Sequence, residues 1–261
     1  MKSFCIRLSC LLIGSIALLG QQASAAQLRS IFNGKDLSGW EGDTTRWSVK
    51  NGSIYGQTTK DAPVLANTFL TWTGGEVSDF EFTCKVKFEG NNSGVQYRSQ
   101  PFGDSGHALM GYQADLHPKP EYFGMMYGEK FGKRGIIAQR HSRIEVGKDG
   151  KTKVIQKVAP SEELVTTEWN TLQIVAVGNR LIHLVNGVIT VDVTDNHPDA
   201  MSKGKLGLQL HRGNPMTVEF KDLKIRPLKG RLANQILENV TGNFPKASGT
   251  KKATAKKKLN R

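Results

Sequence analysis

Cysteine is scarce in this 261-residue sequence, which contains only Cys5, Cys10 and Cys84. Cys5 and Cys10 lie in an N-terminal segment that we expect to be removed, so a mature chain would keep Cys84 alone. One cysteine cannot form an intrachain disulfide, and the fold must therefore be stabilised by a hydrophobic core. Cys84 falls on the apolar face of a predicted strand, which favours a small buried side chain over a nucleophile.

Long helical patterns are also missing, because no segment before residue 230 has a sustained apolar period of 3.6 residues. Strand patterns are frequent instead, and residues 80–88 alternate between apolar and polar side chains over their whole length. Asn51-Gly52 and Asn186-Gly187 predict tight hairpin turns. A break in alternation near Lys221-Asp222 predicts a bulge. We therefore expect residues 26–229 to form one all-β domain, a sandwich of two antiparallel sheets or a jelly roll.

The N-terminal residues have the pattern of a secretory signal peptide. Lys2 and Arg7 precede an apolar run at residues 11–19, and Ala23-Ser24-Ala25 resembles a cleavage site. The run is too short to span a bilayer comfortably. We therefore expect cleavage after Ala25 and an exported protein, either periplasmic or secreted.

Positive charge is concentrated at the C-terminus. The formal net charge is +13, but residues 230–261 contain eight Lys or Arg against one Glu. We expect residues 230–261 to form a basic, disordered C-terminal tail, in which residues 246–261 are of low complexity, although the pattern at 232–240 allows a short helix. No aromatic residue lies in the Lys-rich run, so we expect no nucleic-acid partner. The tail suits contact with anionic surfaces of the cell envelope.

Polar side chains at alternate positions mark three predicted strands. The pairs are Gln96 with Arg98, Gln113 with Asp115, and Gln209 with His211. Because a strand directs alternate side chains to one face, each pair shares a face of its sheet. If the three strands are neighbours, the pairs form a polar patch suited to a carbohydrate or another small molecule.

A series of motifs between residues 30 and 228 resembles a known family. The motifs include Phe32-Asn33-Gly34-Lys35-Asp36-Leu37-Ser38-Gly39-Trp40, Asn92-Ser93-Gly94, Gly111-Tyr112-Gln113-Ala114-Asp115, Gly124-Met125-Met126-Tyr127-Gly128-Glu129 and Gly207-Leu208-Gln209-Leu210-His211. The family is the one long called domain of unknown function 1080, described as 3-keto-disaccharide hydrolase or 3-keto-glucoside 1,2-lyase/hydratase. The resemblance implies a concanavalin-like jelly-roll β-sandwich.

The resemblance also implies a reaction on a glycoside whose C3 hydroxyl has already been oxidised to a ketone. The ketone acidifies the C2 proton, a base removes that proton, and the C1 substituent leaves; addition of water then gives net hydrolysis. His211 is the first candidate for either the base or the acid, and Asp115 is a second candidate for either role. Arg98 is the candidate for stabilising the enolate oxygen.

Further residues have candidate roles in binding. Gln96, Gln113 and Gln209 suit sugar hydroxyls, and Tyr112 and Tyr127 are the aromatic side chains on which a sugar could stack. Glu129, together with His211 or Asp115, is a candidate ligand for a divalent metal ion, although no close ligand spacing such as H-x-x-x-H is present.

Other interpretations remain open. Arg98 could pair with Asp115 across strands, and Gln113 could bond to Gln209. The family often has Glu where this chain has Gln113, and a carboxylate where it has Gly128. No paired-carboxylate run of the form E-x-D-x-x-E is present, which argues against a retaining glycosidase mechanism. A non-catalytic lectin-like module and an envelope scaffold that uses the basic tail are the alternatives to an enzyme.

Overall fold

The computed structural model describes residues 27–104, 106–157 and 166–242. The predicted signal peptide at 1–25 and the Lys-rich run at 246–261 lie outside the described residues. Within those three ranges, none of the helices has the length and apolar character needed to cross a membrane.

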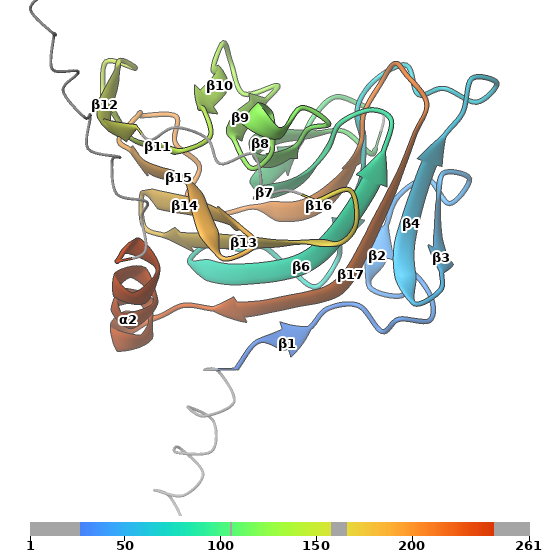
Figure 1. Cartoon of the computed structure of the whole chain (residues 1–261), viewed down its shortest axis with the longest axis horizontal. Helices are drawn as coiled ribbons and strands as arrows, with labels where there is room; N and C mark the ends of the chain where they lie inside the picture. The colour runs from blue at the N-terminus through green and yellow to red at the C-terminus, as the bar shows by residue number, and fades with distance from the viewer. Residues whose placement is uncertain (1–26, 105, 158–165, 243–261) are drawn as a thin grey trace, which may run out of the picture.

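Two sheets pack face to face in a jelly-roll sandwich, which confirms the predicted fold class (Figure 1). The larger sheet has the order β12-β11-β15-β14-β13-β6-β17-β4-β3, and β1 also pairs with β17. Its strands are β1 (Arg29–Ser30), β3 (Trp47–Lys50), β4 (Ser53–Thr58), β6 (Phe80–Glu89), β11 (Ser142–Val146), β12 (Thr152–Lys157), β13 (Asn170–Val177), β14 (Arg180–Val185), β15 (Val188–Asp195) and β17 (Met216–Pro227). All their pairings are antiparallel except that of β11 with β15.

The smaller sheet is antiparallel throughout and has the order β10-β9-β8-β7-β16-β5-β2. Its strands are β2 (Trp40–Glu41), β5 (Thr68–Trp72), β7 (Ser93–Pro101), β8 (Leu109–Leu116), β9 (Met126–Glu129), β10 (Gly135–Ala138) and β16 (Lys205–Leu210). A 3-10 turn, η1 (Pro120–Tyr122), lies between β8 and β9. The three strands predicted to carry paired polar residues, β7, β8 and β16, are therefore neighbours, which is the condition for the predicted polar patch.

The sandwich interior follows the predicted alternation. In β6 the side chains of Phe80, Phe82, Cys84 and Val86 are all buried between the sheets. Burial raises the pKa of the Cys84 thiol well above its ordinary value, so Cys84 is a protonated core side chain. The interpretation of Cys84 as a buried hydrophobe agrees with this position.

The predicted turns and the predicted bulge are also present. Asn51-Gly52 and Asn186-Gly187 join β3 to β4 and β14 to β15, with positive φ at both residues of each turn. The register of β17 with β6 shifts between Lys221 and Lys224, where Asp222 has a φ of 54°. These local patterns could be predicted because Asn and Gly adopt left-handed backbone conformations with little strain.

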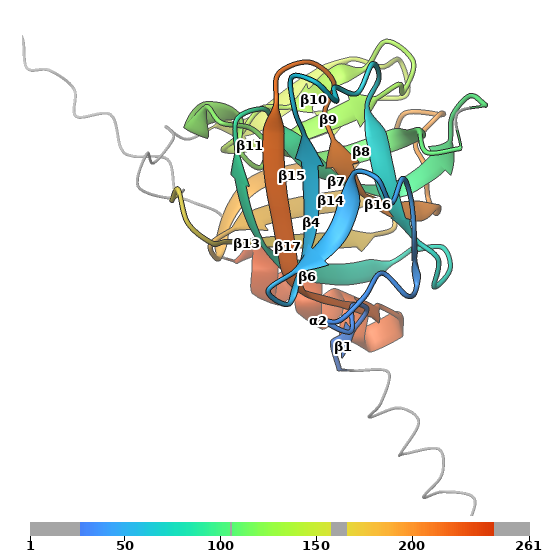
Figure 2. The same ribbon diagram turned by 90° about the vertical axis from the view of Figure 1, so that its right-hand side faces the viewer.

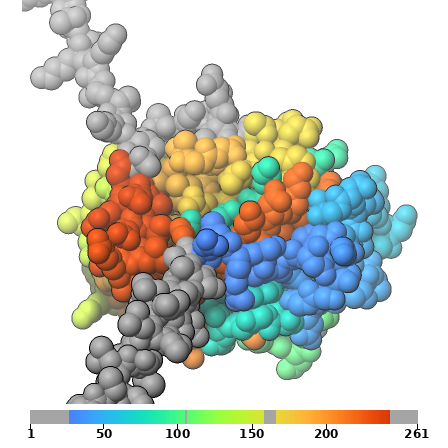
Figure 3. Space-filling view, turned by 90° about the horizontal axis from the view of Figure 1, so that it is seen from below, coloured from blue at the N-terminus to red at the C-terminus, as the bar shows by residue number. Residues whose placement is uncertain are grey.

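A C-terminal helix, α2 (Gly230–Thr241), packs on the outer face of the larger sheet (Figure 2). Its apolar side chains cover a second cluster, separate from the sandwich interior, that includes Val175, Ile182 and Ile189. In Figure 3 the residues of α2, coloured red, lie against the body of the molecule. The allowed helix at 232–240 is thus present, and the expected disordered tail cannot begin at residue 230.

Candidate functional site

The outer face of the smaller sheet carries most of the predicted polar residues. Side chains of Val95, Tyr97 and Ala114 alternate with these residues and point into the sandwich interior. In the register of the sheet, Gln96 lies opposite Gln113, which in turn lies opposite Tyr127. Strand pairing therefore brings together residues that are far apart in the sequence.

A cavity of about 610 Å³ opens on this face. Its lining contains five of the predicted residues, namely Gln113, Asp115, Tyr127, Glu129 and His211. It also contains polar or charged residues that the sequence analysis did not select, namely Asn67, Asn92, His117, Lys130, Lys133 and Arg212. Both candidate acid–base groups, Asp115 and His211, thus line one cavity.

Asp115 is a buried carboxyl group in the wall of this cavity, with 2% of its surface exposed. Its Oδ1 accepts a hydrogen bond of 2.7 Å from Gln113 Nε2, whereas Oδ2 has no partner among the described residues. Burial raises the pKa of Asp115 to about 7; the negative charge of Glu129 adds to the rise and the Gln113 bond opposes it. A group that titrates near neutrality can both take up and release a proton.

Three glutamines lie beside Asp115. Gln113 Nε2 is 3.3 Å from Gln209 Oε1, across the intervening strand β7. Gly94 makes this crossing possible, because a Cβ at that position would lie 2.5 Å from the Gln113 Cδ atom. Gln96 and Gln209 are fully buried and do not line the cavity. Both side-chain polar atoms of Gln96, Gln113 Oε1 and Gln209 Nε2 have no hydrogen-bond partner in the described part of the chain.

Glu129 is held by an amide on the far side of the cavity. Asn67 Nδ2 donates to Glu129 Oε2 at 3.0 Å, and Asn67 Oδ1 accepts from the backbone N–H of Arg212 at 3.0 Å. In the ranges that the structure describes, no group of three His, Cys, Asp or Glu side chains is placed to hold a metal ion. A divalent metal ion at Glu129 therefore stays a prediction, with His211 and Asp115 in the lining of the same cavity.

His211 follows the end of β16, and its ring is oriented by the backbone. Nδ1 lies 2.6 Å from the carbonyl oxygen of Arg212, so this network assigns the Nδ1 proton to that bond. Nε2 then carries the lone pair in the neutral ring and can accept a proton. The side chain of Asn91 also approaches Nδ1, at 3.3 Å.

The structure overturns the role predicted for Arg98. The register of β7 with β8 shifts between Tyr97 and Gln100, and Arg98 has a positive φ of 48°. This bulge breaks the two-residue alternation and turns Arg98 away from the face of Gln96. Its guanidinium donates to the carbonyls of Ser78 and Gly178, at 2.7 Å each, and to Asp79 at 3.0 Å. Arg98 is therefore a buried structural residue outside the cavity, and it does not pair with Asp115.

Tyr112 is also displaced from its predicted role. It is adjacent to Gln113 in β8, so its side chain points to the opposite face, into the sandwich. Its hydroxyl donates to Asp195 Oδ2 at 2.5 Å, and that carboxylate also binds Arg134 at 2.8 Å. Tyr112 cannot contact a molecule in the cavity, whereas Tyr127 lines it.

The residues that the sequence analysis missed had only weak signals. Asn92 and Arg212 stand within or beside motifs already selected, next to Ser93 and His211. Asn67 and His117 lie in connections with no repeating pattern, and strand pairing alone brings them to the cavity.

The fold and the cavity together define a jelly-roll sandwich protein with a polar site on the outer face of one sheet. A family model described as the 3-keto-alpha-glucoside-1,2-lyase-like domain matches residues 27–226. The chain belongs to this family, as the motifs predicted. A search of curated proteins found no match.

Two solved structures from Parabacteroides distasonis ATCC 8503, both of proposed glycosyl hydrolases, are similar in fold. One is 22% identical with a TM-score of 0.52, and the match covers 80% of this chain and 97% of the other. The second is 18% identical with a TM-score of 0.52, covering 77% of this chain and 100% of the other. At these identities the likeness concerns the fold alone.

Proposed function

We propose that the protein is an exported carbohydrate-active enzyme that cleaves 3-keto-glycosides, such as 3-keto-disaccharides, by elimination followed by addition of water. Membership of the family supports the substrate class. The observation that carries the proposal is Asp115, a buried carboxyl group whose Oδ2 has no hydrogen-bond partner among the described residues and whose pKa is raised to about 7 by burial. The N-terminal signal pattern supports export.

Asp115 acts as the base in this proposal. Its carboxylate takes the C2 proton of the substrate, and the electron pair of that C–H bond forms an enolate with the C3 ketone. The enolate then collapses to a C1–C2 double bond, restores the C3 ketone and expels the C1 oxygen. That oxygen takes a proton from Nε2 of His211 in its doubly protonated form, in which Nδ1–H stays bonded to the Arg212 carbonyl. Water then adds its hydroxyl group at C1 and gives its other proton to His211, and Asp115 returns its proton to C2, so both side chains regain their starting forms.

The negative charge on the C3 oxygen needs a nearby cation or hydrogen-bond donor. Arg98 cannot supply it, and Arg212, which lines the cavity, takes its place. Gln113 and Asn92 offer amide groups for sugar hydroxyls, and Tyr127 offers an aromatic surface. A carboxyl group at the position of Gln113 is therefore not required as the base.

A lectin-like module is the competing function, and Gln113 favours it, because its Oε1 has no partner among the described residues and an amide in the cavity wall can recognise a hydroxyl without any reaction. The two functions differ in what they require of Asp115. Binding needs an acceptor, which Asn also provides, whereas proton removal needs a carboxylate.

The test is incubation of the full-length protein with 3-keto-trehalose and with trehalose. We expect cleavage of the keto sugar only, and a loss of at least about 100-fold in kcat/KM for Asp115→Asn. Asp61→Asn makes the same change at an exposed position and should retain full activity.

Binding of 3-keto-trehalose without cleavage, or an Asp115→Asn variant as active as the wild type, would overturn the enzyme proposal. A parallel reaction with a chelator tests whether cleavage requires a divalent metal ion. Loss of cleavage on chelation would show that it does.

A further inference from the structure

We propose that a second cavity, beside the candidate site, binds the leaving group of the glycoside and selects for a neutral sugar there. This inference rests on the proposed function, because it assigns the part of the substrate that is expelled from C1. The cavity has a volume of about 610 Å³, equal to that of the candidate site, and can hold a further sugar unit.

The two cavities are adjacent, because His117 lines both of them. The turn between β6 and β7 also lies between them, since Gly90 lines the second cavity and Asn92 lines the first. Asn91, between these residues, donates to the Arg212 carbonyl at 2.9 Å and so fixes the turn against the His211 loop. A sugar bound at Asp115 therefore needs only to pass His117 to place its C1 substituent in the second cavity.

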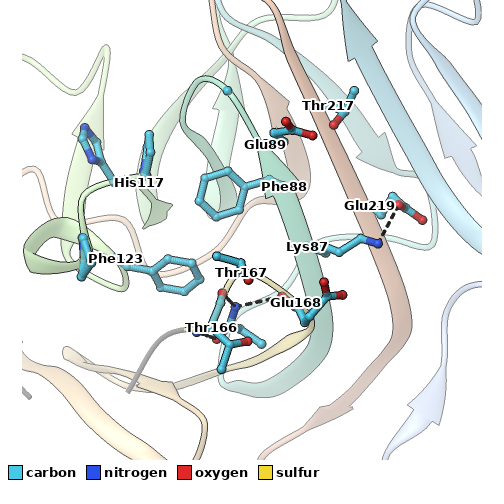
Figure 4. A pocket seen from close by; sticks show the side chains of 14 residues that line it. Lys87, Phe88, Glu89, His117, Phe123, Thr166, Thr167, Glu168, Thr217 and Glu219 are labelled. Atoms are coloured by element: carbon cyan, nitrogen blue, oxygen red, sulfur yellow. Dashed lines mark hydrogen bonds and ion pairs between the residues drawn. The ribbon is translucent and has the colours of Figure 1, made fainter. Parts of the chain in front are cut away.

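The walls of the second cavity suit the two surfaces of a sugar ring. Phe88 and Phe123 face each other there, with ring centroids 5.7 Å apart and planes tilted by 35°, and His117 lies at one end (Figure 4). Aromatic faces pack against the C–H groups of a sugar. Thr167 and Glu168 also line the cavity, where they can bond to hydroxyls (Figure 4).

The charges around the cavity set its selectivity. Among the described residues that line it, three are carboxylates, Glu89, Glu168 and Glu219, and one is a cation, Lys87. Lys87 is already paired with Glu219, with 3.5 Å between Nζ and Oε1. An anionic leaving group such as a uronic acid would be repelled, whereas a neutral sugar can donate its hydroxyl protons to the carboxylates.

His117 provides a hydrogen-bond donor where the cavities meet. Its Nδ1 accepts the backbone N–H of Lys119 at 3.0 Å, which places the ring proton on Nε2 in the neutral form. Burial and the neighbouring charge of Lys119 lower the pKa of His117, so the ring is neutral at pH 7. The Nε2–H group can then bond to the oxygen that links the two sugar units.

The test fills the second cavity without touching the first. Thr167 is exposed and lines only the second cavity, so Thr167→Trp should fold normally and block it. We expect kcat/KM for 3-keto-trehalose to fall by at least about tenfold, because the bulky indole competes with the leaving glucose. For methyl 3-keto-α-glucoside, whose leaving group is methanol, we expect a change of less than about twofold. Thr44→Trp, at an exposed position outside both cavities, should change neither value.

If kcat/KM of Thr167→Trp equals that of the wild type for each substrate, or falls by the same factor for both, the leaving-group site is overturned while the proposed enzyme activity stands. A wild-type protein that cleaves neither keto substrate would overturn the proposed function, and the leaving-group site with it.

Discussion

At the scale of single residues, the chemistry of this site depends on one buried carboxyl group. Asp115 lies among amides and close to Glu129, and its ionised form is poorly solvated there. Its folded-state pKa of about 7 lies well above the ordinary value of 3.8. A raised carboxyl pKa means that the folded protein keeps a proton which the unfolded chain has already released.

Asp115 should therefore make stability depend on pH. Between about pH 4 and pH 7 the folded state binds more protons than the unfolded chain, so the free energy of unfolding falls as pH rises. Above pH 7 both states are ionised and the loss is complete. Asp115→Asn removes this loss and should be more stable than the wild type at pH 8, by up to about 4 kcal/mol, with little difference at pH 4.

Urea unfolding of both proteins at pH 4.5 and pH 8 measures this difference. Asp61→Asn serves as the exposed control and should follow the wild type at both values. A stability difference between Asp115→Asn and the wild type that does not change with pH would show that burial leaves the Asp115 carboxyl titrating at its ordinary value.

At the scale of elements, a buried ion pair holds one wall of the site. The connection between β9 and β10 supplies Gly132 and Lys133 to the cavity. Arg134 closes this connection through a 2.8 Å bond to Asp195, whose side chain is 1% exposed. Tyr112, which cannot touch a ligand, completes the group from β8. The interior network thus positions a surface that it does not itself form.

Asp195→Asn should loosen this wall. Loss of the charge leaves Arg134 without its counter-ion, and we expect a destabilisation of about 3 kcal/mol with a several-fold rise in KM. Hydrogen exchange at residues 130–136 should become faster. These three quantities are measured by urea unfolding, steady-state kinetics and exchange mass spectrometry.

Asp192→Asn is the matched control. Asp192 is equally buried and binds Arg143 and Arg180 in the larger sheet, away from the cavity. The Asp192→Asn variant should be destabilised by a similar amount, while its KM and the hydrogen exchange at residues 130–136 remain those of the wild type. A similar rise in KM for both variants would mean that general loosening, rather than the β9–β10 connection, affects the site.

At the scale of the whole molecule, the outer faces of the two sheets have different roles. The outer face of the smaller sheet carries the site, and α2 covers part of the outer face of the larger sheet. Val175, Ile182, Leu184 and Ile189 would be exposed without α2. Such a patch on a soluble protein promotes association.

Two truncated proteins should distinguish the contribution of α2 to stability from that of the Lys-rich run. A protein ending at Lys229 should lose at least about 3 kcal/mol of unfolding free energy and self-associate, because several buried apolar side chains become exposed. A protein ending at Gly242 should match the full chain in both respects. Urea unfolding and analytical ultracentrifugation distinguish the two, and equal stability of both truncated forms would contradict the role given to α2.

Sequence reasoning succeeded where the determinant is local. Side-chain alternation in β6, the Asn-Gly turns and the bulge at Asp222 depend on neighbouring residues and their φ preferences. The same alternation could have predicted the orientation of Tyr112, because a residue next to Gln113 in a strand must point to the opposite face of the sheet. Alternation failed at Arg98, because the bulge there exists only in the pairing of β7 with β8.

The sequence by itself determined that this chain is an all-β member of its family, with polar residues on three strands. Only the tertiary structure decided which of those residues meet. Strand order brought Asp115, Glu129 and His211 to one cavity and added Arg212 and His117. It also buried Asp115, and burial sets its pKa. The physical reason is that alternation and turns follow from adjacent residues, whereas register, cavity shape and desolvation depend on contacts between distant parts of the chain.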